Sequence, residues 1–190
     1  VCSYHIETPF KPMKGLNRIS VSQMVCAVGT TLTVLLKAGA DTMTRNKDGF
    51  TPLHSAASNG PSEGIQALLA AGADAAARDG DGGTPLHRAA LKNDPASIQT
   101  LLAAGADIMA RGKNGGTVLH WAAIKGHQGN IRALLTAGAD LSALSSGDMT
   151  PLHWAAAIGT SESVQSLLEA GADAKARTGD GDTPWELAQE

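Results

Sequence analysis

The chain has few aromatic residues and few cysteines. Only 3% of its 190 residues are Phe, Trp or Tyr, whereas 43% are hydrophobic. Any core must therefore be built mainly from aliphatic side chains. The two cysteines, Cys2 and Cys26, form neither a CxxC pair nor a Cys/His spacing. This pattern argues against a zinc site and a disulfide framework, and it favours a reducing compartment such as the cytoplasm. Export as an effector is the alternative.

Excess positive charge, long apolar runs and catalytic motifs are also missing. The formal net charge is −3, so no general attraction to nucleic acid or to an anionic membrane is expected. The sequence contains no nucleophile elbow, Walker loop, HExxH motif or paired-acid motif. These absences predict a protein without enzymatic activity, without a cofactor or metal, and without nucleic acid or membrane as its partner.

One segment imitates a secretion signal. Lys14 and Arg18 precede the mostly apolar run 24–36, and Ala38-Gly39-Ala40 has the form of a small-x-small cleavage site. The run is too short to span a bilayer. It ends in the phrase Leu-Leu-x-Ala-Gly-Ala-Asp, with lysine at the variable position, and this phrase returns four times later in the chain, where it cannot be a signal. We therefore interpret this segment as part of the fold.

What the chain does have is a strict internal repeat. Thr51-Pro52-Leu53-His54 returns in steps of 33 residues, without one insertion or deletion. The recurrences start at Thr84, at Thr117 (with valine in place of proline), at Thr150 and, in a more altered form, at Thr183. The Leu-Leu-x-Ala-Gly-Ala-Asp phrase keeps the same step. A fixed period of this size indicates a stack of similar supersecondary units. The sequence thus predicts one elongated repeat domain.

The period and the T-P-L-H-x-A phrase resemble those of ankyrin repeats. The resemblance covers roughly residues 20–190, and it implies an all-α solenoid of helix-turn-helix units joined by β-turn tips. The predicted repeat domain spans 18–190, with repeats at 18–46, 47–79, 80–112, 113–145, 146–178 and, in part, 179–190. Residues 1–17 carry no repeat pattern and are interpreted as an arm, a degenerate repeat or a leader. Because the chain starts at Val1 and stops within a helix, we expect a fragment or a protein with an abbreviated C-terminal cap.

The first repeat is degenerate. Ser20 and Gln23 have the spacing of a capping box, which predicts a helix that ends at Gly29. The leucines of 32–36 predict the second helix. Terminal repeats of solenoids are usually atypical because one face meets solvent instead of a neighbour.

Recurring residues have predicted roles in the scaffold. The threonine of each T-P-L-H phrase suits the N-cap, and the proline suits the first helical position, where no amide donor is needed. Glycine or asparagine follows each inner helix and predicts a left-handed helix end there. These residues are Gly60, Asn93, Gly126 and Gly159. A second set of glycines is predicted to end the outer helices, and it consists of Gly72, Gly105, Gly138 and Gly171. Each outer helix also has apolar residues at i, i+3 and i+4, which predicts one buried stripe.

The histidines of the repeat are predicted to be structural. They are His54, His87, His120 and His153. A spacing of 33 residues would place neighbouring histidines about one repeat apart, too far to share a metal. In ankyrin repeats, which these residues resemble, this histidine hydrogen-bonds the turn threonine and nearby backbone.

Two acidic, glycine-rich segments imitate calcium loops. They are 79–83 (Asp-Gly-Asp-Gly-Gly) and 179–182 (Gly-Asp-Gly-Asp). An EF-hand loop that starts at Asp79 needs glutamate at its twelfth position, which is Ala90. The glycines suit the β-turn at each tip instead.

The residues that differ between repeats are the candidates for a binding site, because tips and inner-helix ends line the surface that grips partners in the family that the chain resembles. The predicted contact residues are Lys47, Asp48, Phe50, Arg88, Lys92, Lys113, Asn114, Trp121, Ile124, Lys125, Asp148, Met149, Trp154 and Ile158. Trp121 and Trp154 occupy equivalent positions, so they could anchor a partner or only pack between repeats. We predict a monomeric, non-enzymatic module that binds another protein. The alternative is a targeting domain of a larger enzyme, effector or toxin.

Overall fold

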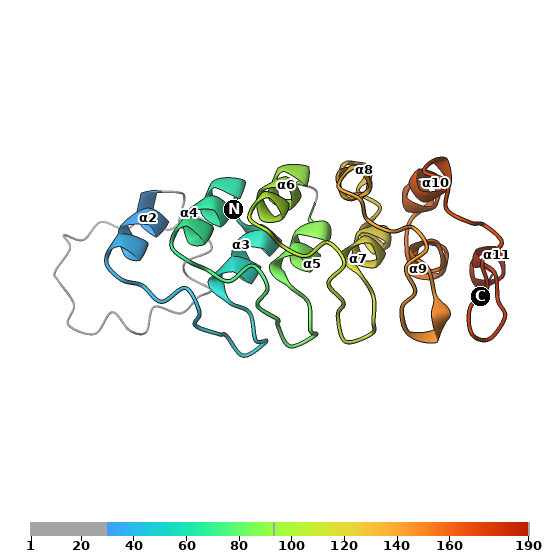
Figure 1. The fold of residues 1–190 in the computed structure, drawn as a ribbon, viewed down its shortest axis with the longest axis horizontal. Coiled ribbons are helices and arrows are strands. Elements are labelled where there is room, and N and C mark those ends of the chain that lie inside the picture. The colour runs from blue at the N-terminus through green and yellow to red at the C-terminus, as the bar shows by residue number, and fades with distance from the viewer. Residues whose placement is uncertain (1–29, 93, 190) are drawn as a thin grey trace.

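The chain folds into a two-layered stack of short helices (Figure 1). The computed structural model describes residues 30–92 and 94–189, and within these ranges it contains helices and no strands. The all-α repeat solenoid predicted from the sequence is therefore confirmed. The arm at 1–17, the predicted first helix at 20–29 and Asn93 lie outside the described residues.

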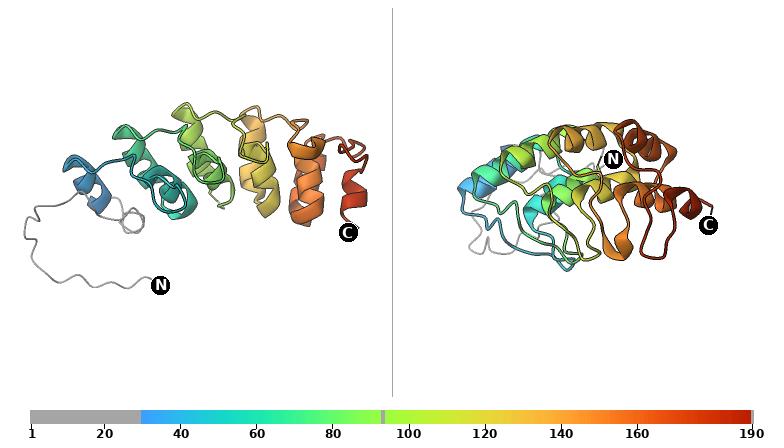
Figure 2. Two further views of the ribbon diagram at one scale, coloured as in Figure 1. Left: turned by 90° about the horizontal axis from the view of Figure 1, so that it is seen from below. Right: turned by 45° about the vertical axis from the view of Figure 1, so that its right-hand side comes forward.

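The helices alternate between an outer and an inner layer along the chain. The outer layer consists of α2 (Thr30–Lys37), α4 (Ser62–Ala70), α6 (Pro95–Ala103), α8 (Gln128–Thr136) and α10 (Ser161–Glu169). The inner layer consists of α3 (Pro52–Asn59), α5 (Pro85–Ala90), α7 (Val118–Lys125), α9 (Pro151–Ile158) and α11 (Pro184–Leu187). The helix pairs follow one another in a single row (Figure 2). After each outer helix the chain runs to a tip beyond the inner layer, and one tip contains a 3-10 turn, Ser146–Asp148.

Capping residues fix where the inner helices begin. Thr51, Thr84, Thr117 and Thr150 have extended backbones at the N-cap. A proline follows in three of these four repeats, at a position whose missing N–H costs no hydrogen bond. This part of the sequence therefore dictates each inner helix start locally.

The core is an aliphatic layer between the two rows of helices. The inner helices contribute Leu53, Leu86, Leu119 and Leu152, each at most 2% exposed. Each outer helix adds its predicted stripe, of which Ile65, Ile98, Ile131 and Leu167 are at most 1% exposed. Full burial of such a side chain contributes roughly 1.5–3 kcal/mol. Because each helix is short, stacking between neighbouring repeats supplies the burial that one pair of helices cannot.

The predicted left-handed ends of the inner helices are present in only one of the three described positions. Gly126 has φ 68°, but Gly60 and Gly159 have φ −83° and −91° with extended backbones. At position 159 glycine is required for a different reason. A Cβ there would lie 2.6 Å from the carbonyl oxygens of both Ala123 and Ala155. Close backbone approach, rather than a positive φ, excludes a side chain at this position.

The glycines after the outer helices have positive φ angles. Gly72, Gly105, Gly138 and Gly171 have φ between 83° and 94°, and a Cβ built on any of them would meet no atom within 4 Å. At these positions a side chain would suffer backbone strain without a collision.

Replacing Gly105 by valine should destabilise the protein by about 1–3 kcal/mol, because a β-branched residue strongly disfavours positive φ. Gly138→Val should behave alike. The measurement is urea unfolding of each variant. Ala104→Val is the matched control, since Ala104 is exposed and has φ −83°. Glycine variants that unfold at the same urea concentration as this control would contradict the assignment.

No helix within 30–92 and 94–189 has the length and apolar character needed to cross a membrane.

Candidate functional site

Backbone hydrogen bonds join the tips into a ladder. In each step a backbone N–H of one tip donates to a carbonyl oxygen of the tip before it, at 2.9 Å. The pairs are Gly80 with Asp48, Lys113 with Asp81, Ser146 with Asn114, and Gly179 with Gly147. The ladder fixes the spacing of the side chains that the tips carry.

Arginines strengthen this ladder. Arg78 Nη1 donates to the carbonyl oxygen of Gly82 in its own tip, at 2.7 Å, and to that of Arg111 in the next repeat, at 2.5 Å. Arg45 and Arg111 make the equivalent pairs of bonds. These arginines were not among the residues predicted from the sequence. Their own 33-residue spacing, interrupted at Leu144, is the signal that could have found them.

The repeat histidines connect each inner helix to two tips. Nδ1 of each ring accepts a hydrogen bond from the backbone N–H of the N-cap threonine, at 3.1–3.2 Å. Nε2 donates to a carbonyl oxygen of the next repeat, at 3.0–3.4 Å. A ring that accepts at Nδ1 and donates at Nε2 is neutral. Burial lowers the pKa of both His87 and His120 to about 4, although the bonds from Nε2 oppose this.

The acidic tip at Asp79 uses its carboxylate internally. Oδ1 accepts from the N–H groups of Asp81 and Gly83, at 2.9 and 3.0 Å, and Oδ2 accepts from Arg88 Nε at 2.6 Å. Burial alone would raise the pKa of Asp79, but Arg88, the Asp81 N–H and His54 together outweigh it and the pKa is lowered. Among the described residues, no three His, Cys, Asp or Glu side chains are grouped so that they could hold a metal.

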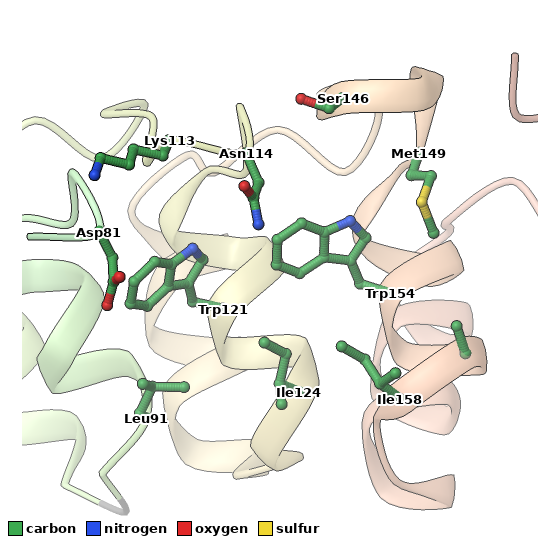
Figure 3. Close-up of a pocket in the computed structure, with 11 residues that line it drawn as sticks. Asp81, Leu91, Lys113, Asn114, Trp121, Ile124, Ser146, Met149, Trp154 and Ile158 are labelled. Atoms are coloured by element: carbon green, nitrogen blue, oxygen red, sulfur yellow. The ribbon is translucent and has the colours of Figure 1, made fainter.

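An open groove lies between the inner helices and the tips of the 80–112, 113–145 and 146–178 repeats (Figure 3). Its volume is about 620 Å³. We call it the indole groove. Its lining consists of Asp81, Leu91, Lys113, Asn114, Trp121, Ile124, Ser146, Met149, Trp154, Ala157 and Ile158.

The two indoles both pack between repeats and line this groove. Trp121 lies edge-on to the ring of His87, with centroids 4.9 Å apart, and Trp154 lies in the same way against His120, at 5.2 Å. Trp154 Nε1 also donates to Ser145 Oγ at 3.0 Å. Both side chains stay partly exposed. The two roles considered from the sequence, packing and lining a binding surface, are thus compatible in the same residues.

Glycines make room for the indoles. A Cβ on Gly83 would lie 3.0 Å from Trp121, and a Cβ on Gly116 would lie 2.8 Å from Trp154. In the first full repeat Phe50 occupies the equivalent position, and the guanidinium of Arg88 lies 4.5 Å from its ring centroid. These three inter-repeat spaces therefore accommodate either glycine with tryptophan or phenylalanine with arginine.

Seven of the predicted contact residues line the indole groove. They are Lys113, Asn114, Trp121, Ile124, Met149, Trp154 and Ile158. The other seven do not line it, and two of these make internal bonds. Arg88 forms ion pairs with Asp79 and Asp81, and Lys92 donates to the Gly60 carbonyl and to Asp94 at 3.3 Å.

The remaining five predicted residues lie outside the groove lining. Phe50 is partly exposed beneath Arg88. The others are exposed, and they are Lys47, Asp48, Lys125 and Asp148.

Four lining residues were not among the predicted contacts. They are Asp81, Leu91, Ser146 and Ala157. Each occupies the same repeat position as a residue that was predicted; for example, Leu91 is equivalent to Ile124. Extending the prediction to all equivalent positions would have found them.

Comparison with protein families gives one match. A family model described as ankyrin repeats (3 copies) matches residues 23–112 and 86–178. No curated protein matches the chain.

Proposed function

Because the chain belongs to the ankyrin repeat family, we propose that it is a non-enzymatic module that binds a partner protein in the indole groove. Ankyrin repeats are in general protein–protein interaction modules. The partner-binding role of this particular groove is our proposal.

One observation carries the proposal: a partly exposed apolar surface extends along the inner helices of three repeats. Ile158 is 63% exposed at the end of α9, and Leu91 and Ile124, one repeat position earlier, lie near the ends of the preceding inner helices. The two indoles stand above these aliphatic side chains, and polar tip residues border them (Figure 3). Contiguous apolar surface with a polar border is typical of interface cores.

Truncation of the indoles should weaken partner binding. Once a partner has been captured and identified, Trp121→Ala and Trp154→Ala should each reduce its affinity by about 2 kcal/mol or more, because tryptophans in such positions are frequent hot spots. Isothermal titration calorimetry with the purified partner measures this. Trp185→Ala is the matched control, since Trp185 is 71% exposed and lies outside the groove.

A second variant separates binding from folding. Trp154→Ala also removes the bond to Ser145 and the contact with His120, so it should lower stability. Ile158→Asp should leave stability nearly unchanged, because the side chain is mostly exposed. It should still weaken binding, because it places a charge in the apolar surface. Unchanged affinity in all three groove variants would refute the proposal and redirect the search to Lys47, Asp48 and Phe50.

A further inference from the structure

The charged groups that line the indole groove differ in whether they are already paired. The lining carboxylate, Asp81, accepts a hydrogen bond from Arg88 Nη2 at 2.7 Å. The lining ammonium, Lys113, is exposed and has no ion-pair partner in the described part of the chain. Lys125, the last residue of α7, is likewise exposed and unpaired within 30–92 and 94–189. The charge that remains free at the tip before α7 and at the end of α7 is therefore positive.

The neutral polar groups of the groove supply donors in the same place. Within the described residues, the side-chain nitrogens of Trp121 and Asn114 make no hydrogen bond, whereas the indole of Trp154 is bound to Ser145. The Asn114 amide points toward the space between the two indoles (Figure 3). An indole N–H and an ammonium can only donate. A complementary partner must therefore offer acceptors to this side of the groove.

The positions of the charges also predict which helix the acidic groups of a partner lie over. Lys113 lies in the tip that precedes α7 and Lys125 ends that helix, so Trp121 and Ile124 lie between them in the sequence. Asp148 is exposed in the next tip and repels acidic groups. Acidic groups of a partner should therefore lie over α7, not over α9.

From these contacts we infer that the groove binds a short acidic peptide segment with one large apolar side chain. This inference rests on the proposed function and specifies its partner. The apolar side chain lies between Trp121 and Trp154, above Ile124. Carboxylates that flank it pair with Lys113 and Lys125, and backbone carbonyls accept from Asn114 and the Trp121 indole.

Selection from a random peptide library displayed on phage tests the inference. Peptides that the purified protein retains should be enriched in Asp and Glu on either side of Leu, Phe or Trp. One synthetic peptide with the selected sequence is then titrated by fluorescence anisotropy. It should bind the Lys113→Glu/Lys125→Glu variant at least about tenfold more weakly than wild type, because two attractions become repulsions. Added salt should weaken binding to the wild type.

A matched pair of charge reversals provides the control. Lys37 and Lys175 are exposed, do not line the groove and do not adjoin a lining residue, so Lys37→Glu/Lys175→Glu makes the same change in net charge elsewhere. It should leave the affinity within about twofold of wild type. Equal losses in the two double variants would overturn the inference.

Other outcomes separate this inference from the proposed function. Selected peptides that lack acidic residues but lose binding in Trp121→Ala would refute the acidic segment and leave the groove as the binding site. Peptides that bind every groove variant equally would refute both. An empty selection would overturn the peptide inference, and the partner-binding measurements would still decide the proposed function.

Discussion

At pH 5 the protein should be about 4 kcal/mol less stable than at pH 7, because two buried histidines resist protonation in the folded state. The folded pKa of His87 and of His120 is about 4, below the ordinary value of 6.5. The unfolded chain therefore binds more protons than the folded one at pH values between these two. The free energy of unfolding is therefore highest above pH 6.5 and decreases as the pH drops toward 4. Linkage gives about 2 kcal/mol for each residue at pH 5.

The hydrogen bonds explain why protonation is unfavourable. Nδ1 of His87 accepts from the backbone N–H of Thr84 at 3.2 Å. A proton on Nδ1 would replace this acceptor with a donor facing another donor. Nε2 is already used, since it donates to the Gly116 carbonyl. His120 has the same arrangement with Thr117 and Met149. Burial lowers the pKa of His54 as well, so this residue acts in the same direction.

Urea unfolding at the two pH values measures the effect. A His87→Gln/His120→Gln variant should be less stable than wild type at pH 7 but should lose much less stability on acidification. His127→Gln is the control, because His127 lies at the N-cap of α8 and outside this hydrogen-bond network. A wild-type protein that unfolds at the same urea concentration at both pH values would refute the prediction.

The regular parts of the fold could be predicted because the residues that start and end each helix act on their neighbours in the chain. Thr51 and Pro52 set the start of α3 by capping and by a fixed φ. Gly105 ends an outer helix by its positive φ. Both effects act within a few residues of the chain, so a sequence pattern is enough to recognise them.

Interactions between repeats were harder to predict. Glycine at position 159 was assigned to a left-handed helix end, yet its backbone is extended. A glycine in a sequence indicates only that a side chain is disfavoured. It does not distinguish positive φ from close approach to another helix, because the second cause depends on how tightly α7 and α9 pack.

The candidate site could also be predicted only in part from the sequence. Trp121 and Lys113 were predicted to lie on one surface from their repeat positions, and both line the groove. Arg88 was predicted to contact a partner, but Asp79 and Asp81 bind its guanidinium. The sequence of residues 79–83, Asp-Gly-Asp-Gly-Gly, had indicated only a β-turn. The pairing depends on how the tip folds back toward the inner helix that follows it, which the residue pattern does not show.

The second large effect follows from this close packing. Gly159→Ala should destabilise the protein by about 2–4 kcal/mol, although φ −91° is allowed for alanine. The new Cβ would lie 2.6 Å from the carbonyl oxygens of Ala123 and Ala155 and 2.7 Å from the Ala155 Cα. All of these are backbone atoms, so a side-chain rotation cannot relieve the collision. Either α9 must unwind at its end or α7 and α9 must separate.

Gly171→Ala is the informative comparison. It introduces backbone strain without a collision, whereas Gly159→Ala introduces a collision without a positive φ. Gly171 has φ 94°, which alanine disfavours, but its Cβ would meet no atom within 4 Å. Strain alone should cost about 1–2 kcal/mol. If close approach is the stronger requirement, Gly159→Ala unfolds at a lower urea concentration than Gly171→Ala. The opposite order would mean that the two helices separate easily, and that positive φ is the more important reason for glycine in this repeat.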